Sequence, residues 1–247
     1  SNTTYYYRIR ALGATGNSDY TLAVGATTAS PSGPVGHWRF DNNFTDASGN
    51  NRIGTAVNGA SFNANSIQGS HSLALNGSGQ YVNVVNDAGL PAGNSPRTLS
   101  AWALTNSVAS GYRWVVSYGN DANGEAMYIG MYGSDLKVGS WGAPNTFHFG
   151  GAWSVGQWKH ICLTYDGAIA KVYINGDEAA SQAMSWNLVI DDFFIGRQIN
   201  NSGEYWNGLI DDVRVYDRAL TSAEIQALAA TVPAPPAPSA LTATIHG

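Results

Sequence analysis

The chain has 247 residues, enough for one sizeable hydrophobic core, or for one core with fragments of others. Only 12% of the residues are charged, whereas glycine is abundant and aromatic residues make up 11%, a composition typical of an all-β extracellular domain. The net charge of -5, with only 12 basic residues, disfavours nucleic-acid partners, and no apolar run is long enough for membrane insertion.

Residues 1–29 carry two runs in which apolar and polar residues alternate, separated by a Gly/Asn turn. Tyr5 and Tyr7 share one face of the first run, and Tyr20 and Leu22 share one face of the second. This pattern predicts one β-hairpin, which is too small to be stable alone. The segment resembles the last two strands of a fibronectin type III domain, with Tyr5 at the position of the tyrosine corner.

Strand patterns recur at short intervals through residues 33–230. Asp166-Gly167 and Asn175-Gly176 bracket one of them, and Asn-Gly between alternating runs is a strong hairpin signal. Asn76-Gly77 offers a third turn of this kind. About a dozen strands without interleaved helices predict an all-β fold of two stacked antiparallel sheets, a sandwich or jelly roll.

The end of this region predicts one short helix. Thr221 and Glu224 have the spacing of a capping box, and Ile225 and Leu228 follow at helical spacing. Residues 231–247 are rich in Pro and Ala and predict an extended linker that runs into a segment similar to the first strand of another fibronectin type III domain. We therefore expect a monomeric module cut from a longer chain.

Six motifs carry a resemblance to a known family. They are HWRFDNNFTDASGNN (37–51), GSHSLALNG (69–77), TLSAWA (98–103), WKHICLTYDG (158–167), VYING (172–176) and GLIDDVRVYDRALTSAEI (208–225). In this order they resemble the LamG-like domains of the concanavalin A-like lectin/glucanase superfamily. The resemblance implies a jelly-roll fold for residues 33–230, and it says less about function because LamG-like domains are functionally diverse.

The resemblance also implies a structural calcium ion where the first and last strands of the domain lie together. Its side-chain ligands would be an Asp after the first strand and an Asp at the start of the last, positions that Asp41 and Asp211 hold. Backbone carbonyls of Asn43 and of the turn around Ser72 would complete the oxygen shell that Ca²⁺ requires. The alternative is that Asp41 caps a turn and Asp211 pairs with an arginine. Asp212 follows Asp211 directly in the same predicted strand, so its side chain points to the opposite face and is expected to face solvent.

A sugar-binding surface needs flat aromatic rings together with side chains that hydrogen-bond to hydroxyl groups, and residues 112–153 are rich in aromatic rings. In the segment EAMYIGMYG, alternation puts the Met and Ile side chains on one face, the natural core, and the tyrosines on the other. Long loops at 139–153 and 197–205 add further aromatic and polar groups. The predicted ligand-binding residues are Tyr128, Tyr132, Trp141, His148, Arg197 and Tyr205. The alternative is ordinary sandwich packing of these side chains.

Catalytic motifs are missing from the sequence. Glucanases of this fold carry three acids on one strand, and none of Glu125, Glu178, Glu204 and Glu224 lies in such a motif. Gly-x-Ser-x-Gly and His-Glu-x-x-His are also absent. We therefore predict a non-catalytic module of a secreted or cell-surface protein that binds a polysaccharide or glycan. The alternative is an adhesive or architectural spacer that contacts proteins and has no sugar site.

Overall fold

The computed structural model describes residues 3–28, 32–86, 88–142, 144–199 and 203–230. The chain divides into two compact units, Ser1–Gly33 and Pro34–Gly247. In the described part of the chain, no helix is long and apolar enough to cross a membrane.

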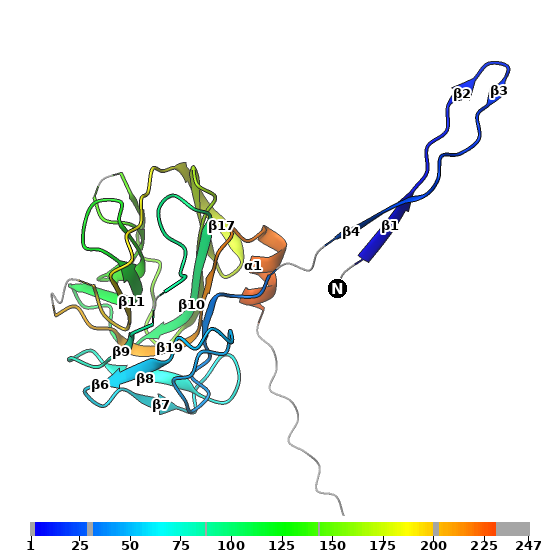
Figure 1. Ribbon diagram of the computed structural model, residues 1–247. Helices are drawn as coiled ribbons and strands as arrows, with labels where there is room; N and C mark the ends of the chain where they lie inside the picture. Colours follow the sequence, from blue (N-terminus) through cyan, green and yellow to red (C-terminus); the bar gives the residue numbers. More distant parts are fainter. Residues whose placement is uncertain (1–2, 29–31, 87, 143, 200–202, 231–247) are drawn as a thin grey trace, which may run out of the picture. The chain divides into compact units, whose positions relative to one another are not determined.

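The first unit is a pair of short antiparallel ribbons (Figure 1). Strand β1 (Thr3–Tyr7) pairs with β4 (Val24–Thr28), and β2 (Leu12–Gly13) pairs with β3 (Gly16–Asn17). The side chains of residues 6–24 are exposed, so this stretch encloses no core of its own. Its likeness to a fibronectin type III domain stays a prediction. The predicted linker and strand at 231–247 lie outside the described residues.

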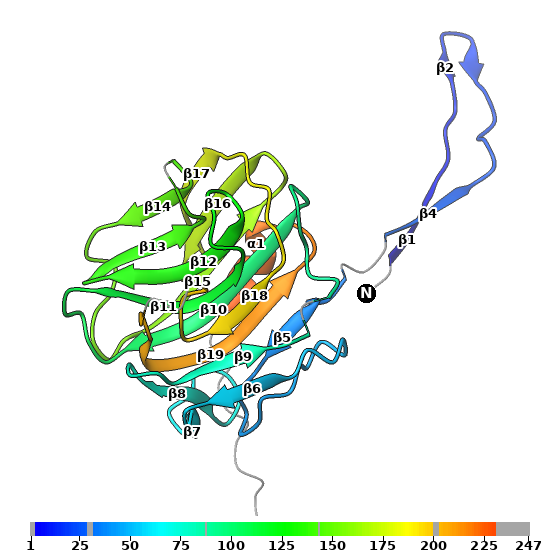
Figure 2. The same ribbon diagram turned by 60° about the vertical axis from the view of Figure 1, so that its left-hand side comes forward.

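In its described residues, the second unit consists of two antiparallel sheets and one helix (Figure 2). The eight-stranded sheet has the order β17-β16-β15-β10-β19-β8-β7, with β5 also paired to β19. Its strands are β5 (Gly36–Trp38), β7 (Ser61–Asn63), β8 (Ser72–Asn76), β10 (Arg97–Thr105), β15 (Trp158–Tyr165), β16 (Ile169–Ile174), β17 (Asp177–Ala183) and β19 (Asn207–Tyr216).

The seven-stranded sheet has the order β14-β13-β12-β11-β18-β9-β6. Its strands are β6 (Gly54–Val57), β9 (Tyr81–Val84), β11 (Tyr112–Gly119), β12 (Ala126–Tyr132), β13 (Asp135–Gly139), β14 (Thr146–Phe149) and β18 (Asp192–Ile195). The two sheets make the all-β jelly-roll sandwich predicted from the strand patterns.

The hydrophobic core lies between the two sheets. Trp38 of the eight-stranded sheet meets Phe193 of the seven-stranded sheet edge to face, with ring centroids 4.9 Å apart. In β12, Met127, Ile129 and Met131 are fully buried in this core. Alternation along the strand therefore directs the side chains between them to the outer face of the sheet, as predicted.

The helix α1 (Ser222–Ala229) packs on the other face of the eight-stranded sheet, where Ile225 joins a small cluster with Tyr173 and Tyr216. The predicted capping box is confirmed, since the Thr221 side chain accepts from the Glu224 N–H and the Glu224 side chain accepts from the Thr221 N–H. The helix therefore closes the domain directly after its last strand.

The turn predictions hold at two sites and fail at the third. Asp166-Gly167 lies in the hairpin turn between β15 and β16, which pair antiparallel. Asn175 and Gly176 have φ values of 53° and 93° and join β16 to β17 as a tight hairpin. The prediction of a hairpin at Asn76-Gly77 is wrong. Strand β8 before this turn belongs to the eight-stranded sheet and β9 after it to the seven-stranded sheet, so the turn carries the chain between the sheets.

Candidate functional site

The register of β11 to β14 arranges the outward-facing residues of the seven-stranded sheet in rows. In one row Trp114, Gly130, Lys137 and His148 are successive cross-strand partners. The row on one side of it contains Tyr112, Tyr132 and Asp135, and the row on the other side contains Ser117, Tyr128, Gly139 and Thr146. Aromatic and polar side chains far apart in the sequence are thereby brought side by side.

Trp114 forms the floor of this surface because its partner is a glycine. A Cβ atom on Gly130 would lie 2.3 Å from the Cε3 atom of the indole, so a larger residue would collide with the ring. Tyr112 stacks on Trp114 with an angle of 6° between the ring planes and 5.8 Å between the centroids. The two rings therefore lie in parallel planes, and Tyr112 is 44% exposed whereas Trp114 is 2% exposed.

Tyr128 and Trp141 form a wall at a steep angle to this floor. Their ring centroids are 4.4 Å apart, and the planes of Tyr128 and Trp141 meet that of Trp114 at 72° and 81°. The Tyr128 hydroxyl lies 2.6 Å from Thr146 Oγ1. Burial raises the pKa of Tyr128 to about 12, so the phenol is neutral at physiological pH.

Backbone turns fix the two loops that reach this surface. The turn carrying Trp141 is closed by a hydrogen bond from Ser140 N to Asn145 O of 2.9 Å. Glu204 is placed by short β-bridges from Tyr205 to residues 114 and 197. Its Oε2 atom accepts a hydrogen bond of 2.5 Å from Trp114 Nε1.

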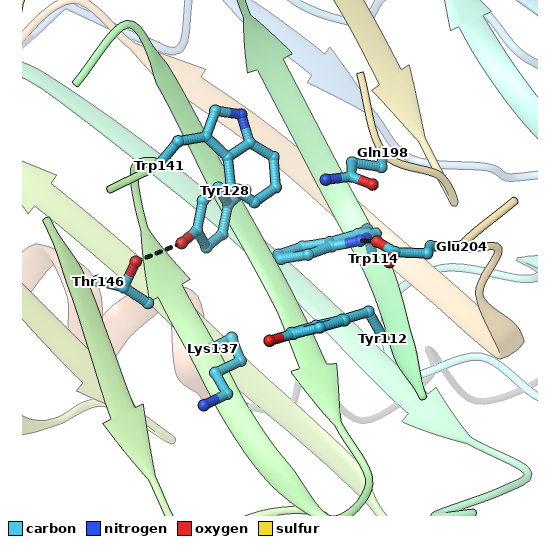
Figure 3. Close-up of a pocket in the computed structure, with 8 residues that line it drawn as sticks. All are labelled: Tyr112, Trp114, Tyr128, Lys137, Trp141, Thr146, Gln198 and Glu204. Carbon is cyan, nitrogen blue, oxygen red and sulfur yellow. Dashed lines mark hydrogen bonds between the residues drawn. The ribbon is translucent and has the colours of Figure 1, made fainter. Parts of the chain in front are cut away.

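These elements enclose a pocket of about 410 Å³ on the outer face of the seven-stranded sheet (Figure 3). Lys137 and Thr146 lie on one side of the aromatic floor, and Gln198 and Glu204 lie on the other. Glu204 is the one carboxylate among the described residues that line the pocket, which are Tyr112, Trp114, Tyr128, Lys137, Trp141, Thr146, Gln198 and Glu204. The pocket combines flat apolar surfaces with hydrogen-bonding groups on two sides.

Four of the predicted ligand-binding residues lie in or beside the pocket. Tyr128 and Trp141 line it. Tyr132 is 41% exposed and contacts Tyr112 just outside it, at a centroid distance of 4.7 Å. His148 is exposed on the edge strand β14, and its Nε2 atom is 2.8 Å from Asp135 Oδ2.

The other two, Arg197 and Tyr205, do not line the pocket. The Arg197 guanidinium is buried over Phe194 and Tyr81, at 4.3 and 4.7 Å from their ring centroids. Tyr205 stacks on Tyr81 as well. Arginine is readily buried this way, because its weakly hydrated planar cation stacks on aromatic faces.

The loop 197–205 was predicted to reach the ligand surface, but Gln198 and Glu204, which line the pocket, were not among the predicted ligand-binding residues. Lys137 and Thr146 were also missed, because only the cross-strand register shows that they lie beside Tyr128. Two features of the sequence could have indicated Trp114. The two-residue alternation of β11 directs its side chain to the outer face of the sheet, and a glycine lies in the adjacent strand.

The predicted metal ligands converge on one segment, residues 67–70. Asp41 Oδ1 accepts hydrogen bonds from the Ser70 backbone N–H at 2.5 Å and from the Ser70 hydroxyl at 3.2 Å. Asp211 Oδ2 accepts from the backbone N–H groups of Ile67 and Gln68, both at 3.0 Å. Strand β5 pairs with β19, so the first and last strands of the domain do lie side by side.

Asp211 is fully buried, and its Oδ1 atom has no hydrogen-bond partner in the described part of the chain. Burial raises the pKa of this carboxyl to about 7, although the two backbone N–H groups oppose the shift. A buried carboxylate oxygen without a partner is costly, and a cation is one group that would satisfy it. The Asp211 Oδ1 atom therefore suits a hard cation, whereas both Asp41 oxygens already accept hydrogen bonds, Oδ1 from Ser70 and Oδ2 from Arg39 Nε at 3.1 Å.

Asn43 and Ser72 use their side chains locally. Asn43 Nδ2 donates to the Asp41 carbonyl, and the Ser72 hydroxyl donates to the Asn65 carbonyl at 2.7 Å. Among the described residues no group of three or more His, Cys, Asp or Glu side chains is placed to hold a metal ion. A cation bound by Asp41 and Asp211 would therefore need carbonyl oxygens as well.

The prediction that Asp212 faces solvent is wrong. A bulge in β19 between Asp211 and Arg214 interrupts the two-residue alternation, and Asp212 there has a φ of 50°. Asp212 is 5% exposed and binds His37 Nε2 at 2.7 Å and Arg214 Nη2 at 2.9 Å. Burial would raise the pKa of Asp212, but these two partners outweigh it and lower the pKa.

Comparisons with solved structures find the same fold in binding domains of larger proteins. Domain 4 of AbnA, an extracellular arabinanase from Geobacillus stearothermophilus solved with arabinotriose, is 22% identical with a TM-score of 0.65, over 80% of this chain and 98% of that chain. The binding domain of botulinum neurotoxin serotype D, solved with N-acetylneuraminic acid, is 15% identical with a TM-score of 0.62. The match covers 79% of this chain and 50% of that chain. The binding domain of Paraclostridial mosquitocidal protein 1 is 17% identical with a TM-score of 0.59. The match covers 75% of this chain and 48% of that chain.

The chain spans about half the length of these toxin domains. A search of curated proteins found no match. Residues 76–226 match the family Laminin_G_3, described as the concanavalin A-like lectin/glucanases superfamily. This match covers more than half of the chain and includes the strands that build the pocket. The chain belongs to the concanavalin A-like lectin/glucanases superfamily.

Proposed function

We propose that the pocket on the seven-stranded sheet binds a carbohydrate. The observation that carries this proposal is the corner formed by the parallel rings of Tyr112 and Trp114 and the steeply inclined ring of Trp141. The apolar face of a sugar ring packs on such flat surfaces, while Gln198 and Glu204 on one side and Thr146 on the other hydrogen-bond to its hydroxyl groups. Domains of this fold solved with arabinotriose and with N-acetylneuraminic acid support the proposal.

The proposed activity is binding without hydrolysis. Most glycosidases use two carboxylates that flank the scissile bond. The described residues lining the pocket offer Glu204 alone, and one of its oxygens is already bonded to Trp114 Nε1. This arrangement favours a carboxylate that accepts hydrogen bonds from a ligand over one that acts in catalysis.

A structural calcium ion bound by Asp41 and Asp211 is part of the proposal. The buried Oδ1 atom of Asp211 supports it, and carbonyl oxygens of Asn43 and the turn around Ser72 would complete the coordination. The ion would add positive charge between β5, β19 and the segment 67–70. Its role would be to hold the domain together, because Asp211 lies in the eight-stranded sheet and Asp41 in the loop after β5, whereas the pocket lies on the other sheet.

The proposed setting is a secreted or cell-surface protein in which this domain is a monomeric binding module. The extracellular arabinanase that contains a domain of this fold supports this setting.

Affinity gel electrophoresis against plant, algal and animal polysaccharides, followed by calorimetry, tests the proposal. We expect retardation by at least one polysaccharide, and Tyr112→Ala and Trp141→Ala should each weaken binding roughly tenfold, or about 1.4 kcal/mol. Trp158→Ala is the matched control, since this partly exposed Trp lies on the eight-stranded sheet. Failure of the wild-type domain to bind any of the polysaccharides would favour the spacer function instead.

A further inference from the structure

Lys137 occupies the middle of the outward-facing row on the pocket surface. Its cross-strand partner on β12 is Gly130, where the Trp114 ring takes the space that a side chain would occupy. Its partner on β14 is His148. The close-up shows the Lys137 side chain beside the rings of Tyr112 and Tyr128, on the side of the pocket opposite Glu204 (Figure 3).

The Lys137 ammonium group has no ion pair among the described residues. Asp135, the neighbouring acid on the same strand, accepts hydrogen bonds from His148 Nε2 at 2.8 Å and from Gly151 N at 2.9 Å. Lys171, in contrast, pairs with Glu178 at 2.9 Å. Lys137 therefore brings to the pocket a positive charge that no salt bridge fixes, although it lies near enough to Asp135 to help lower the pKa of that carboxyl.

The opposite side of the pocket carries negative charge. Glu204 faces Lys137 across the aromatic floor, and its Oε2 atom is fixed by Trp114 Nε1. Gln198 lies next to it and offers a neutral amide. The pocket is thus electrically polarised, so the two ends of a charged sugar are not equivalent in it.

We infer that the pocket takes an acidic sugar unit whose anionic group lies at Lys137 and whose hydroxyl groups lie toward Gln198 and Glu204. This inference rests on the proposed carbohydrate binding and names its ligand class. In the reverse orientation the anionic group would meet the Glu204 carboxylate and be repelled. The net charge of -5 gives no general attraction for acidic polymers, so the preference arises locally at Lys137.

The size of the preference follows from the partial exposure of Lys137. A charge-assisted hydrogen bond is about twice as strong as a neutral one, but an ion pair in contact with solvent contributes little because water screens it. We expect roughly a two- to fivefold preference for the acidic sugar over a neutral sugar of the same shape. Salt should reduce this preference, since the Debye length falls to about 3 Å at 1 M.

The test compares uronic acid oligosaccharides, from polygalacturonate, alginate and glucuronoxylan, with the same oligosaccharides after their carboxylates are reduced to primary alcohols. Calorimetry on the wild-type domain should show tighter binding of at least one unreduced form. Lys137→Gln should abolish this preference, and Lys137→Arg should retain it. The control Lys159→Gln removes the same charge from the eight-stranded sheet and should leave the preference unchanged.

A sulfated oligosaccharide and its desulfated form make a further arm. A Lys137-dependent preference confined to this arm also supports the inference and identifies the anionic group as a sulfate ester. Equal affinity for the charged and neutral forms in every arm, or a preference that survives in Lys137→Gln, would overturn the inference while leaving carbohydrate binding intact. Absence of binding to all forms would overturn the proposed function itself.

Discussion

Gly130 and Trp114 are cross-strand partners, and the indole of Trp114 lies where a side chain of residue 130 would be, 2.3 Å from an ideal Cβ. The Trp114 ring can therefore form the floor of the pocket only because residue 130 has no Cβ atom. Strand interiors seldom favour glycine, because it has no side chain to pack, so Gly130 is explained by this close approach.

The first prediction concerns this contact. Gly130→Ala should displace the Trp114 ring and weaken glycan binding at least tenfold, with a shift in tryptophan fluorescence. Gly150→Ala is the matched control, because a Cβ there would have Asp135 Oδ1 as its nearest atom at 3.8 Å and the residue does not need a positive φ. Wild-type affinity in Gly130→Ala would show that the position of the ring does not matter for the ligand.

The second prediction concerns calcium. Adding Ca²⁺ at about 100 times its dissociation constant should stabilise the folded domain by ~2.7 kcal/mol. The melting temperature, measured by calorimetry, should rise in the wild type and stay constant in Asp211→Asn, which removes the buried carboxylate. Asp166→Asn, which alters a turn between β15 and β16, should keep the response to calcium. An unchanged melting temperature of the wild type in Ca²⁺ would argue against the ion.

The third prediction concerns the buried pair of Asp212 with Arg214 and His37. Asp212→Asn keeps the shape and tolerates the positive φ, but it leaves the partly buried Arg214 without its counter-ion. We expect a loss of roughly 3 kcal/mol in the free energy of unfolding, measured with urea. Glu178→Gln breaks the exposed pair with Lys171 and should cost less than about 1 kcal/mol. Similar losses for both variants would mean that burial of the pair is energetically unimportant.

The fourth prediction concerns the pH dependence of stability. Burial lowers the pKa of His160 from 6.5 to about 4. The unfolded chain therefore takes up a proton near pH 6.5 while the folded chain does not, so stability is present above this pH and is lost as the pH falls toward 4. The loss should approach ~3 kcal/mol.

Denaturation of wild type and His160→Gln at several pH values measures this effect. The difference between the two profiles removes the contribution of the carboxylates, which both proteins share. A difference that stays constant between pH 7 and pH 4 would contradict a depressed His160 pKa.

Periodicity predicted the fold and one wall of the pocket. The alternation in β12 assigned Met127 and Ile129 to the core and Tyr128 to the outer face, because strand parity is a local property. It could not show that Lys137 and Trp114 lie beside Tyr128, since this depends on the pairing register of four strands. The two-residue alternation also predicted the wrong environment for Asp212, because a bulge that the sequence does not mark interrupts it there.

The loop before β19 shows a second limit. Arg197 and Tyr205 looked suited to a ligand because they are polar or aromatic in a long loop. In the structure they pack with Tyr81, and the adjacent Gln198 and Glu204 face the pocket. Which residues of an irregular loop point to a site is decided by tertiary packing, and no local pattern encodes it.

The central claim is tested most directly by a crystal structure of the domain with the oligosaccharide that binds it most tightly. Our account predicts a sugar ring against Tyr112, Trp114 and Trp141, with hydroxyl groups within hydrogen-bond distance of Glu204. A sugar bound instead at the amide-lined hollow beside Asn76 and Asn207 on the eight-stranded sheet, with the aromatic pocket empty, would contradict it.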